Sequence, residues 1–88
     1  MKTRKKDYGK ANSVGKHIEY LRIKKKIKQA DFIARLQAYG LDINPTSYSK
    51  LEGQLRQAND LELYYIARVL GVDIKELFFE YEKNHSDD

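Results

Sequence analysis

The sequence predicts an all-α fold, a compact five-helix bundle in a single domain. Apolar residues recur at intervals of three and four along most of the 88 residues, whereas strict alternation of apolar and polar residues is absent, and this pattern favours helices over strands. Hydrophobic residues make up 41% of the chain, which is enough for one modest core. Because the chain has no cysteine, a disulfide framework and a thiolate zinc site are excluded.

The first helix is predicted to begin at Ser13, whose hydroxyl is a suitable cap. Val14, Ile18 and Leu21 form one apolar stripe at helical spacing and are expected in the core. The preceding residues 1–12 are basic and lack apolar periodicity, so we expect a flexible basic arm there. Two interpretations of the arm remain, a contact with the DNA minor groove or a terminus without a specific role.

A second helix is predicted over residues 27–36, with apolar residues at Phe32, Ile33 and Leu36. Gly40 is expected to end this region in the left-handed conformation that glycine adopts readily. The chain then returns beneath the helix and enters a third helix. Two helices around one connection are typical of a helix-turn-helix.

The third predicted helix has the sharpest beginning. Asn44 is a favourable cap, and Pro45 at the first helical position loses no hydrogen bond. One face is apolar and is expected to point inward, through Tyr48, Leu51 and Leu55. The opposite face is small, polar or cationic and carries Thr46, Ser49, Lys50 and Gly53. Taken alone, such a helix is also typical of an ordinary amphipathic surface helix.

Two further helices are predicted from their capping signals. Asn59 and Glu62 have the spacing of a reciprocal capping pair, and Gly71 is suited to end that helix. Asp73 and Glu76 repeat the signal for the fifth helix. Its apolar residues exceed what a short terminal helix needs for packing, so candidate dimer contacts are Phe78, Phe79 and Tyr81. The alternative is that these three residues only cover the base of the core.

Residues 14–78 resemble the Cro and phage-repressor class of helix-turn-helix regulators, the XRE family. The matching positions are Ile18, Leu21, Arg22, Gln29, Tyr48, Leu51, Glu52, Ala67, Leu70, Gly71, Val72 and Leu77. The chain departs from the family pattern in three places. Lys28 replaces the usual hydroxyl cap, Lys26 replaces a frequent glycine, and the segment between Leu36 and Asn44 is longer than the commonest spacing by about five residues.

The resemblance implies a fold of the repressor-like DNA-binding type, with the helix-turn-helix formed by the second and third helices over a domain of residues 13–82. A flexible basic arm, residues 1–12, precedes this domain, and a polar tail, residues 83–88, follows it. The implied function is sequence-specific binding of double-stranded DNA by a small homodimeric transcriptional regulator, a repressor, that reads the major groove with residues 45–52. The alternative is an antitoxin or protein-interaction module of the same fold, with a protein partner and secondary DNA binding. The resemblance also implies a structural ion pair between Arg22 and Glu52.

The expected residue roles follow from how such regulators bind DNA. The reading helix lies in the major groove with its N-terminal residues at the base edges, and the helix before it crosses the backbone. The candidates for base contacts are Pro45, Thr46, Ser49 and Lys50. The candidates for phosphate contacts are Gln29, Asn44, Ser47, Lys28, Lys26 and Arg56.

The charge of the chain is unevenly distributed. Residues 1–58 carry fourteen Lys and Arg against five Asp and Glu, a net charge of +9, whereas residues 59–88 carry three against eight, a net charge of −5. Basic surfaces bind DNA largely through the counterions that phosphates release. The basic part also contains the predicted reading helix. The alternative for the lysines at positions 24–28 is a solvated loop without a role.

Other functional classes lack support in the sequence. The two histidines, His17 and His85, have no catalytic or metal-ligating companion at useful spacing, and the chain has no glycine-rich phosphate loop. We therefore expect no enzyme activity, no cofactor and no metal. The sequence contains neither a signal segment nor an apolar run of membrane length, so we expect no membrane partner and a cytoplasmic protein.

Overall fold

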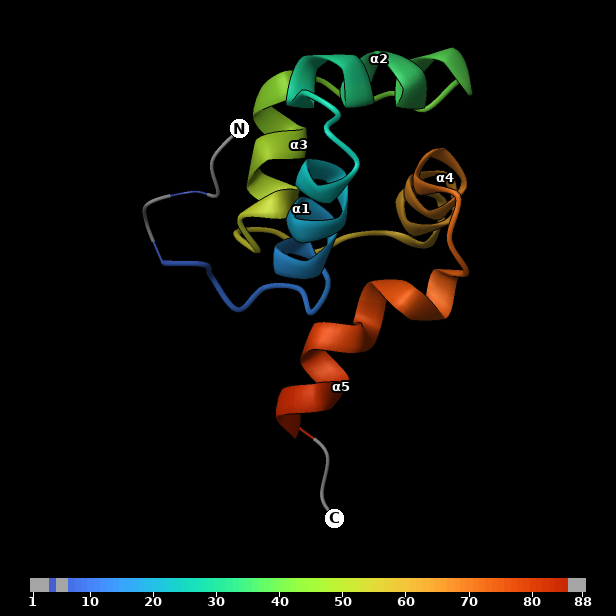
Figure 1. Cartoon of the computed structure of the whole chain (residues 1–88). Helices are drawn as coiled ribbons and strands as arrows, with labels where there is room; N and C mark the ends of the chain where they lie inside the picture. Colours follow the sequence, from blue (N-terminus) through green and yellow to red (C-terminus); the bar gives the residue numbers. More distant parts are fainter. Residues whose placement is uncertain (1–3, 5–6, 86–88) are drawn as a thin grey trace.

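The computed structural model describes residue 4 and residues 7–85, which form an all-helical fold (Figure 1). No strand occurs among these residues. The helices are α1 (Gly15–Lys24), α2 (Gln29–Ala38), α3 (Pro45–Glu52), α4 (Asp60–Leu70), the 3-10 helix η1 (Ile74–Phe78) and α5 (Phe79–His85). In Figure 1, α3 lies beside α1, α2 passes across one end of this pair, and η1 and α5 follow α4 to the opposite end.

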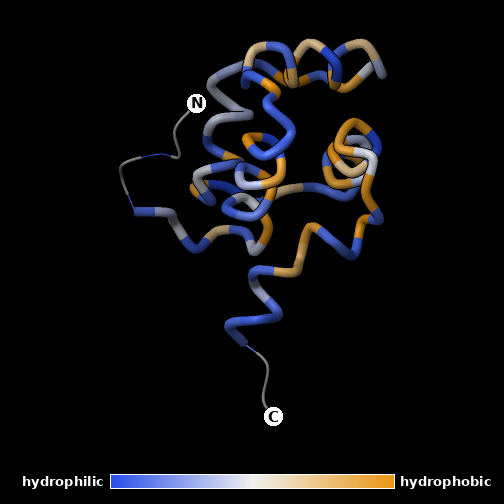
Figure 2. Tube along the Cα trace, in the orientation of Figure 1, coloured by the Kyte–Doolittle hydropathy of each residue, from blue (hydrophilic) through white to orange (hydrophobic). Residues whose placement is uncertain are grey.

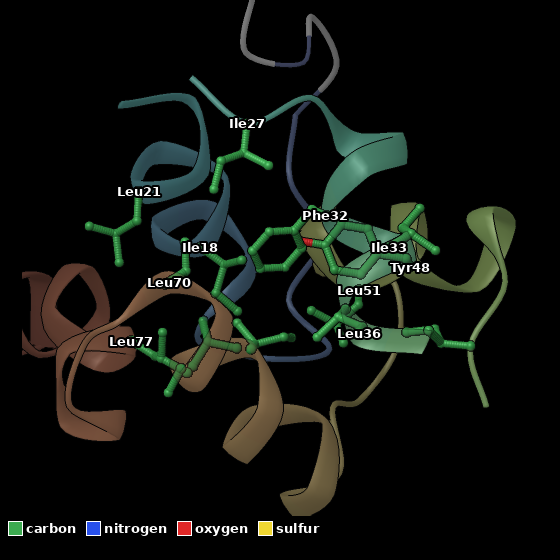
Figure 3. Packing of buried hydrophobic residues seen from close by; sticks show 14 residues of the cluster. Ile18, Leu21, Ile27, Phe32, Ile33, Leu36, Tyr48, Leu51, Leu70 and Leu77 are labelled. Carbon is green, nitrogen blue, oxygen red and sulfur yellow. The ribbon is translucent and has the colours of Figure 1, made fainter. Parts of the chain in front are cut away.

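The core lies where the apolar faces of α1 to α4 and η1 meet (Figure 3). The tube in Figure 2 shows hydrophobic positions on the facing sides of these helices. The rings of Phe32 and Tyr48 pack against each other with centroids 5.5 Å apart, and this contact joins α2 to α3. The completely buried hydrophobic residues are Ile18, Phe32, Leu36, Tyr48, Leu51, Ile66 and Leu77. The predicted all-helical class is confirmed.

The beginning of α1 differs from the prediction that Ser13 caps it. The side-chain oxygen of Asn12 accepts hydrogen bonds from the backbone N–H groups of Val14 and Gly15, at 3.0 and 2.9 Å. Both residue types are good caps. The cap residue itself is Val14, without a side-chain capping bond, and the amide nitrogen of Asn12 also donates to the backbone carbonyls of Leu51 and Arg56.

The connections around α2 contain two residues in the left-handed region of backbone conformation. Lys26 has φ 60° and Gly40 has φ 95°. The prediction for Gly40 is confirmed, and Ile43 is buried beyond it. Lys26 adopts this left-handed conformation although it carries a side chain, and such a conformation favours glycine. α2 begins at Gln29 rather than Ile27.

α3 has the predicted bounds, but the apolar stripe does not continue to Leu55 as expected. The side chain of Asn44 accepts the N–H of Ser47 at 2.8 Å, and Pro45 occupies the first helical position. The helix ends at Glu52, and Gln54 then turns the chain with φ 59°. This turn removes Leu55 from the inward stripe, so Leu55 is 59% exposed. Gly53, expected on the outward face, is buried.

The C-terminal helices follow their capping signals. Asn59 and Glu62 form the predicted reciprocal capping pair, and Gly71 ends α4 with φ 70°. The predicted fifth helix is divided into the 3-10 helix η1, capped by the side chain of Asp73, and α5. Because α5 continues to His85, residues 83–85 of the predicted polar tail are helical. Residues 86–88 lie outside the described part of the chain.

Candidate nucleic-acid interface

The first turn of α3 is exposed and has the chemistry of a groove-binding surface. Asn44, Pro45, Thr46 and Lys50 are exposed. The N-terminus of a helix presents backbone N–H groups and a positive dipole end, both of which attract phosphate. Three of the predicted base-contacting residues are therefore exposed on α3: Pro45, Thr46 and Lys50.

The two serines of α3 are less accessible than the residues around them. Ser47 and Ser49 are half-buried. Their carbonyl oxygens already accept side-chain hydrogen bonds, the first from Arg56 at 2.9 Å and the second from Arg4 at 3.0 Å. The accessible surface of α3 is therefore concentrated in its first turn and at Lys50.

A group of lysines lies in the connection between α1 and α2. All four are exposed: Lys24, Lys25, Lys26 and Lys28. Lys28 occupies the cap position of α2 without a side-chain capping bond, and the ammonium of Lys24 lies 5.8 Å from the centre of the Tyr20 ring. The predicted phosphate-contacting residues Lys26 and Lys28 are thus free of steric cover. We call the first turn of α3 (Asn44, Pro45, Thr46), Lys50 and these four lysines the candidate interface.

Arg56, a predicted phosphate contact, has its guanidinium engaged within the protein. Its guanidinium donates to both carboxylate oxygens of Glu62, at 3.0 and 2.7 Å, and to the carbonyls of Ser47 and Gln57. These bonds use most of its five N–H donors. Arg56 thus joins the first turn of α3 to the beginning of α4.

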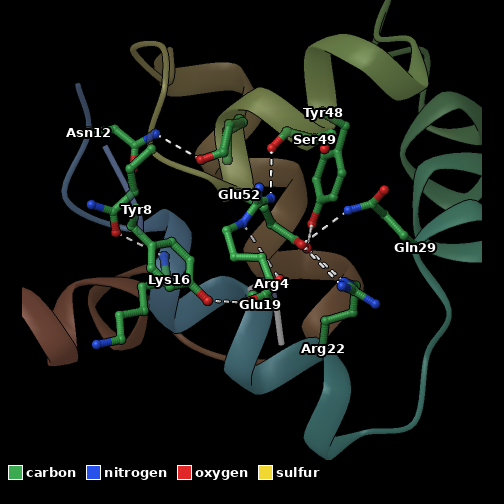
Figure 4. Close-up of polar contacts among 12 residues, drawn as sticks. Arg4, Tyr8, Asn12, Lys16, Glu19, Arg22, Gln29, Tyr48, Ser49 and Glu52 are labelled. Carbon is green, nitrogen blue, oxygen red and sulfur yellow. Dashed lines mark hydrogen bonds and ion pairs between the residues drawn. The ribbon is translucent and has the colours of Figure 1, made fainter. Parts of the chain in front are cut away.

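The buried carboxylate of Glu52 lies behind α3 and connects three helices (Figure 4). The ion pair expected between Arg22 and Glu52 is present, with Nε and Nη2 of Arg22 donating to the carboxylate at 2.7 and 3.0 Å. The hydroxyl of Tyr48 donates at 2.6 Å and the side-chain amide of Gln29 at 3.2 Å. Gln29, a predicted phosphate contact, therefore directs its amide nitrogen inward.

Burial and the charge of Glu52 shift the pKa values of Tyr48 and Arg22. Burial raises the pKa of Tyr48 well above its ordinary value, and the negative charge of Glu52 acts in the same sense. For Arg22, burial lowers the pKa, but the hydrogen bond and the charge of Glu52 outweigh burial and raise it. Both shifts favour a neutral phenol beside a charged guanidinium.

The N-terminal segment, here Arg4 and residues 7–12, lies against the end of α3. The backbone N–H groups of Gly9 and Ala11 donate to the carbonyls of Gly53 and Gln54, at 2.8 and 2.9 Å. The side chain of Asn12 donates to Leu51 and Arg56 carbonyls. Residues 9–12 of the predicted flexible arm are thus hydrogen-bonded to the domain. Residues 1–3, 5 and 6 of that arm lie outside the described residues.

The candidate dimer contacts differ in accessibility. Phe78 packs against the core, whereas Phe79 is 53% and Tyr81 45% exposed. Phe79 also packs on the buried His17, at 5.4 Å between ring centroids. The ring nitrogens of His17 lie 4.0 and 3.9 Å from the carboxylates of Glu76 and Glu80, beyond hydrogen-bond distance. Phe79 and Tyr81 therefore remain as candidate dimer contacts on the surface.

Sequence reasoning missed Asn12 and Gln54, which hold the end of α3. Both lie outside any apolar periodicity, and each binds a segment that is about 40 residues away in the chain. An asparagine two residues before an apolar stripe was the one available signal, because asparagine is a strong helix cap. Gln54 offered no signal.

No group of three or more His, Asp or Glu side chains among the described residues is arranged to hold a metal ion. None of the described helices is both long and apolar enough to cross a membrane. In the comparisons with known proteins, no family model, curated protein or solved structure matched the chain.

Proposed function

We propose that this chain binds double-stranded DNA as a helix-turn-helix regulator of the Cro and phage-repressor type, with α2 and α3 as the helix-turn-helix. In this proposal the first turn of α3 enters the major groove, and the lysines between α1 and α2 contact phosphates. The protein acts as a homodimeric repressor in the cytoplasm.

The observation that carries the proposal is the exposed, sharply capped start of α3 above a buried carboxylate. Asn44, Pro45 and Thr46 are exposed, and the opposite side of the same short helix is fixed by Tyr48 and Glu52. A helix that reads bases needs both properties, because its outer face must fit the groove while its inner face holds its orientation.

The residues support particular roles in recognition. Pro45 and Thr46 offer apolar contact with a thymine methyl group and one hydroxyl hydrogen bond, and Lys50 reaches the acceptor atoms of guanine. Lys26 and Lys28 supply charge for phosphates. Because proline provides no hydrogen bond to a base, part of the sequence discrimination comes from the shape of the DNA.

The charge distribution agrees with this orientation. The part of the chain that contains α3 carries a net charge of +9, and the part that contains α4, η1 and α5 carries −5. In this proposal the acidic part faces away from DNA, since like charge repels phosphates.

The test is a selection of binding sites from a random DNA pool, followed by affinity measurements over a range of salt concentrations. The proposal expects a two-fold symmetric site with half-sites about 34 to 36 Å apart. Lys50→Glu should abolish specific binding, whereas Lys83→Glu in the exposed part of α5 serves as the matched charge reversal and should retain it. Binding that is independent of salt, or equal for both variants, would contradict the proposal.

A protein-interaction role is the second candidate, and the exposure of Phe79 and Tyr81 favours it. Large exposed aromatic side chains are typical of protein interfaces. In an antitoxin-like protein these residues would bind a partner protein and DNA binding would be weak. Capture of one partner that survives high salt and is lost on Phe79→Ser supports this candidate over the regulator.

A further inference from the structure

We infer that the N-terminal segment positions α3 for DNA without itself touching DNA, and that Asn12 and Gln54 are the positioning residues. The inference rests on the proposed function, because it assigns a role in the same interface. For Arg4 and residues 7–12, it replaces an arm that contacts the minor groove with a segment that is bound to the protein.

Asn12 joins the start of α1 to the end of α3 through one side-chain amide (Figure 4). Its nitrogen donates to the carbonyls of Leu51 and Arg56, at 2.9 and 2.8 Å. Its oxygen accepts from the N–H groups of Val14 and Gly15. The two N–H groups lie at the start of α1, the Leu51 carbonyl lies in the last turn of α3, and the Arg56 carbonyl lies in the loop that follows. One side chain therefore joins the start of α1 to the end of α3 and the loop after it.

Gln54 makes the reciprocal connection. Its side-chain oxygen accepts from the N–H of Lys16 at 2.9 Å, and its side-chain nitrogen donates to the carbonyl of Gly9 at 3.0 Å. The backbone of Gln54 also accepts from Ala11. Gln54 holds this position although its φ of 59° is unfavourable for a residue with a side chain. Its side-chain bonds therefore stabilise a strained turn at the end of α3.

Two glycines allow the backbones to approach closely enough for these bonds. A Cβ atom on Gly9 would lie 2.3 Å from the carbonyl oxygen of Gln54. A Cβ atom on Gly15 would lie 2.4 and 2.5 Å from the carbonyl oxygens of Leu51 and Glu52. Because the obstructing atoms belong to the backbone, the contact leaves little freedom for α3 to move relative to α1.

The same segment directs its arginine into the protein. Arg4 donates to the carbonyl of Ser49 at 3.0 Å, and its Nε lies 3.9 Å from the carboxylate of Glu19. The hydroxyl of Tyr8 donates to the same carboxylate. The charge of Arg4 is thus engaged with α1 and α3. In the described segment, Lys10 is the lysine that remains exposed.

The consequence for binding follows from geometry. Contacts with base edges require side chains held to about 0.5 Å, whereas contacts between lysine ammonium groups and phosphates tolerate larger displacements. Removing the contacts between the N-terminal segment and α3 should therefore weaken specific DNA binding more than non-specific DNA binding. It should leave the salt dependence unchanged, because no phosphate contact is lost.

The experiment measures affinity for the DNA site selected with the full-length chain, and affinity for unrelated DNA, at several salt concentrations. Gln54→Gly removes both side-chain bonds and relieves the backbone strain. We expect about tenfold weaker specific binding, as losing two hydrogen bonds can produce, with unchanged non-specific binding and salt slope. Gln54→Glu retains the acceptor for Lys16 and loses the donor to Gly9. Its specific affinity should therefore lie between those of Gln54→Gly and the unmodified chain, and this variant provides the test if Gln54→Gly fails to fold.

Lys10→Gln is the matched control within the segment, and it should change neither affinity nor salt slope. A fall in slope of about 0.9, the value of one phosphate contact, would show that the segment touches DNA and would overturn the inference. So would specific binding by Gln54→Gly and Gln54→Glu equal to that of the unmodified chain. Failure of the unmodified chain to bind any DNA in a salt-dependent manner would instead overturn the proposed function.

Discussion

Arg22 donates two hydrogen bonds to the buried carboxylate of Glu52, at 2.7 and 3.0 Å, and so ties α1 to α3. The carboxylate is completely buried and the guanidinium side chain is 6% exposed. In such surroundings the desolvation of two charges offsets much of their attraction. The ion pair between Arg22 and Glu52 therefore contributes more to the orientation of α3 than to the net free energy of unfolding.

Removing one partner should be costly. Glu52→Ala leaves the charge of Arg22 and the hydroxyl of Tyr48 without their buried acceptor, and we expect a loss of roughly 3 to 5 kcal/mol in the free energy of unfolding. Urea unfolding followed by circular dichroism measures this loss. The double variant Arg22→Met, Glu52→Leu should be more stable than Glu52→Ala, since no charge is stranded. Equal stability of Glu52→Ala and the unmodified chain would refute the assigned role.

Gly15→Ala should destabilise the protein although alanine ordinarily favours helices. In an unobstructed helix interior the change from glycine to alanine stabilises by about 0.5 to 1 kcal/mol. At Gly15 the new methyl group meets two backbone oxygens of α3 at 2.4 and 2.5 Å, and overpacking of this kind costs about 1 to 3 kcal/mol.

Gly53→Ala is the comparison for this prediction. Its methyl group would meet the end of the Arg4 side chain at 2.8 Å, and a flexible side chain can move aside. We expect a smaller decrease in melting temperature for Gly53→Ala than for Gly15→Ala. The reverse order would show that the contact between α1 and α3 is less close than the structure has it.

Lys26→Gly should stabilise the free protein. The left-handed conformation at φ 60° costs a residue with a side chain roughly 1 to 2 kcal/mol, and glycine loses about 0.5 to 1 kcal/mol of this gain through its more flexible unfolded chain. A net gain of about 0.5 to 1 kcal/mol remains, measurable by urea unfolding without DNA.

The matched change Gln54→Gly relieves a similar φ of 59° but removes hydrogen bonds to Lys16 and Gly9. Each such bond contributes about 0.5 to 1.5 kcal/mol. We therefore expect this variant to be less stable than the unmodified chain by about 1 kcal/mol. Equal effects of the two substitutions would mean that the side-chain bonds of Gln54 contribute nothing to stability.

Glu62 should make the free energy of unfolding depend on pH in the acidic range. Burial raises the pKa of this carboxyl, but hydrogen bonds from Arg56 and from the backbone of Asn59 outweigh burial and lower it below its ordinary value of 4.5. Because the pKa is lower in the folded state, the contribution to stability is fully present above pH 4.5 and disappears as the pH falls through the folded-state value.

Glu62→Gln should therefore be less stable than the unmodified chain at pH 7, and the difference should shrink at pH 3. Unfolding by urea at both pH values measures it, with Glu82→Gln in the exposed part of α5 as the control. A difference that is constant with pH would show that the carboxylate charge is unimportant.

Sequence reasoning recovered the features that depend on local patterns. The caps at Asn44 and Asn59, the left-handed Gly40 and Gly71, and the apolar stripe of α1 are set by neighbouring residues. It also placed Arg22 with Glu52, but this came from the resemblance to a family and not from spacing. Local pattern thus predicted the helices, and resemblance predicted the one long-range pair.

The structure differs from expectation where contacts outside a single helix determine the placement of a side chain. Leu55 has the spacing of an inward residue, but the turn at Gln54 directs it to solvent. Arg56 has the charge for a phosphate contact, but Glu62 engages its guanidinium. Asn12, rather than Ser13, accepts the N–H groups at the start of α1, and its amide also reaches α3.

The packing of Tyr39 on Tyr65, with ring centroids 5.2 Å apart, joins the end of α2 to α4. The chain has seven tyrosines and no tryptophan, so its ultraviolet emission comes from phenol rings alone. Stacked and carboxylate-bonded phenols emit differently from hydrated ones. The native protein thus carries an intrinsic optical signal, to which the Tyr39 and Tyr65 pair contributes, and this signal allows ligand titrations without any attached dye.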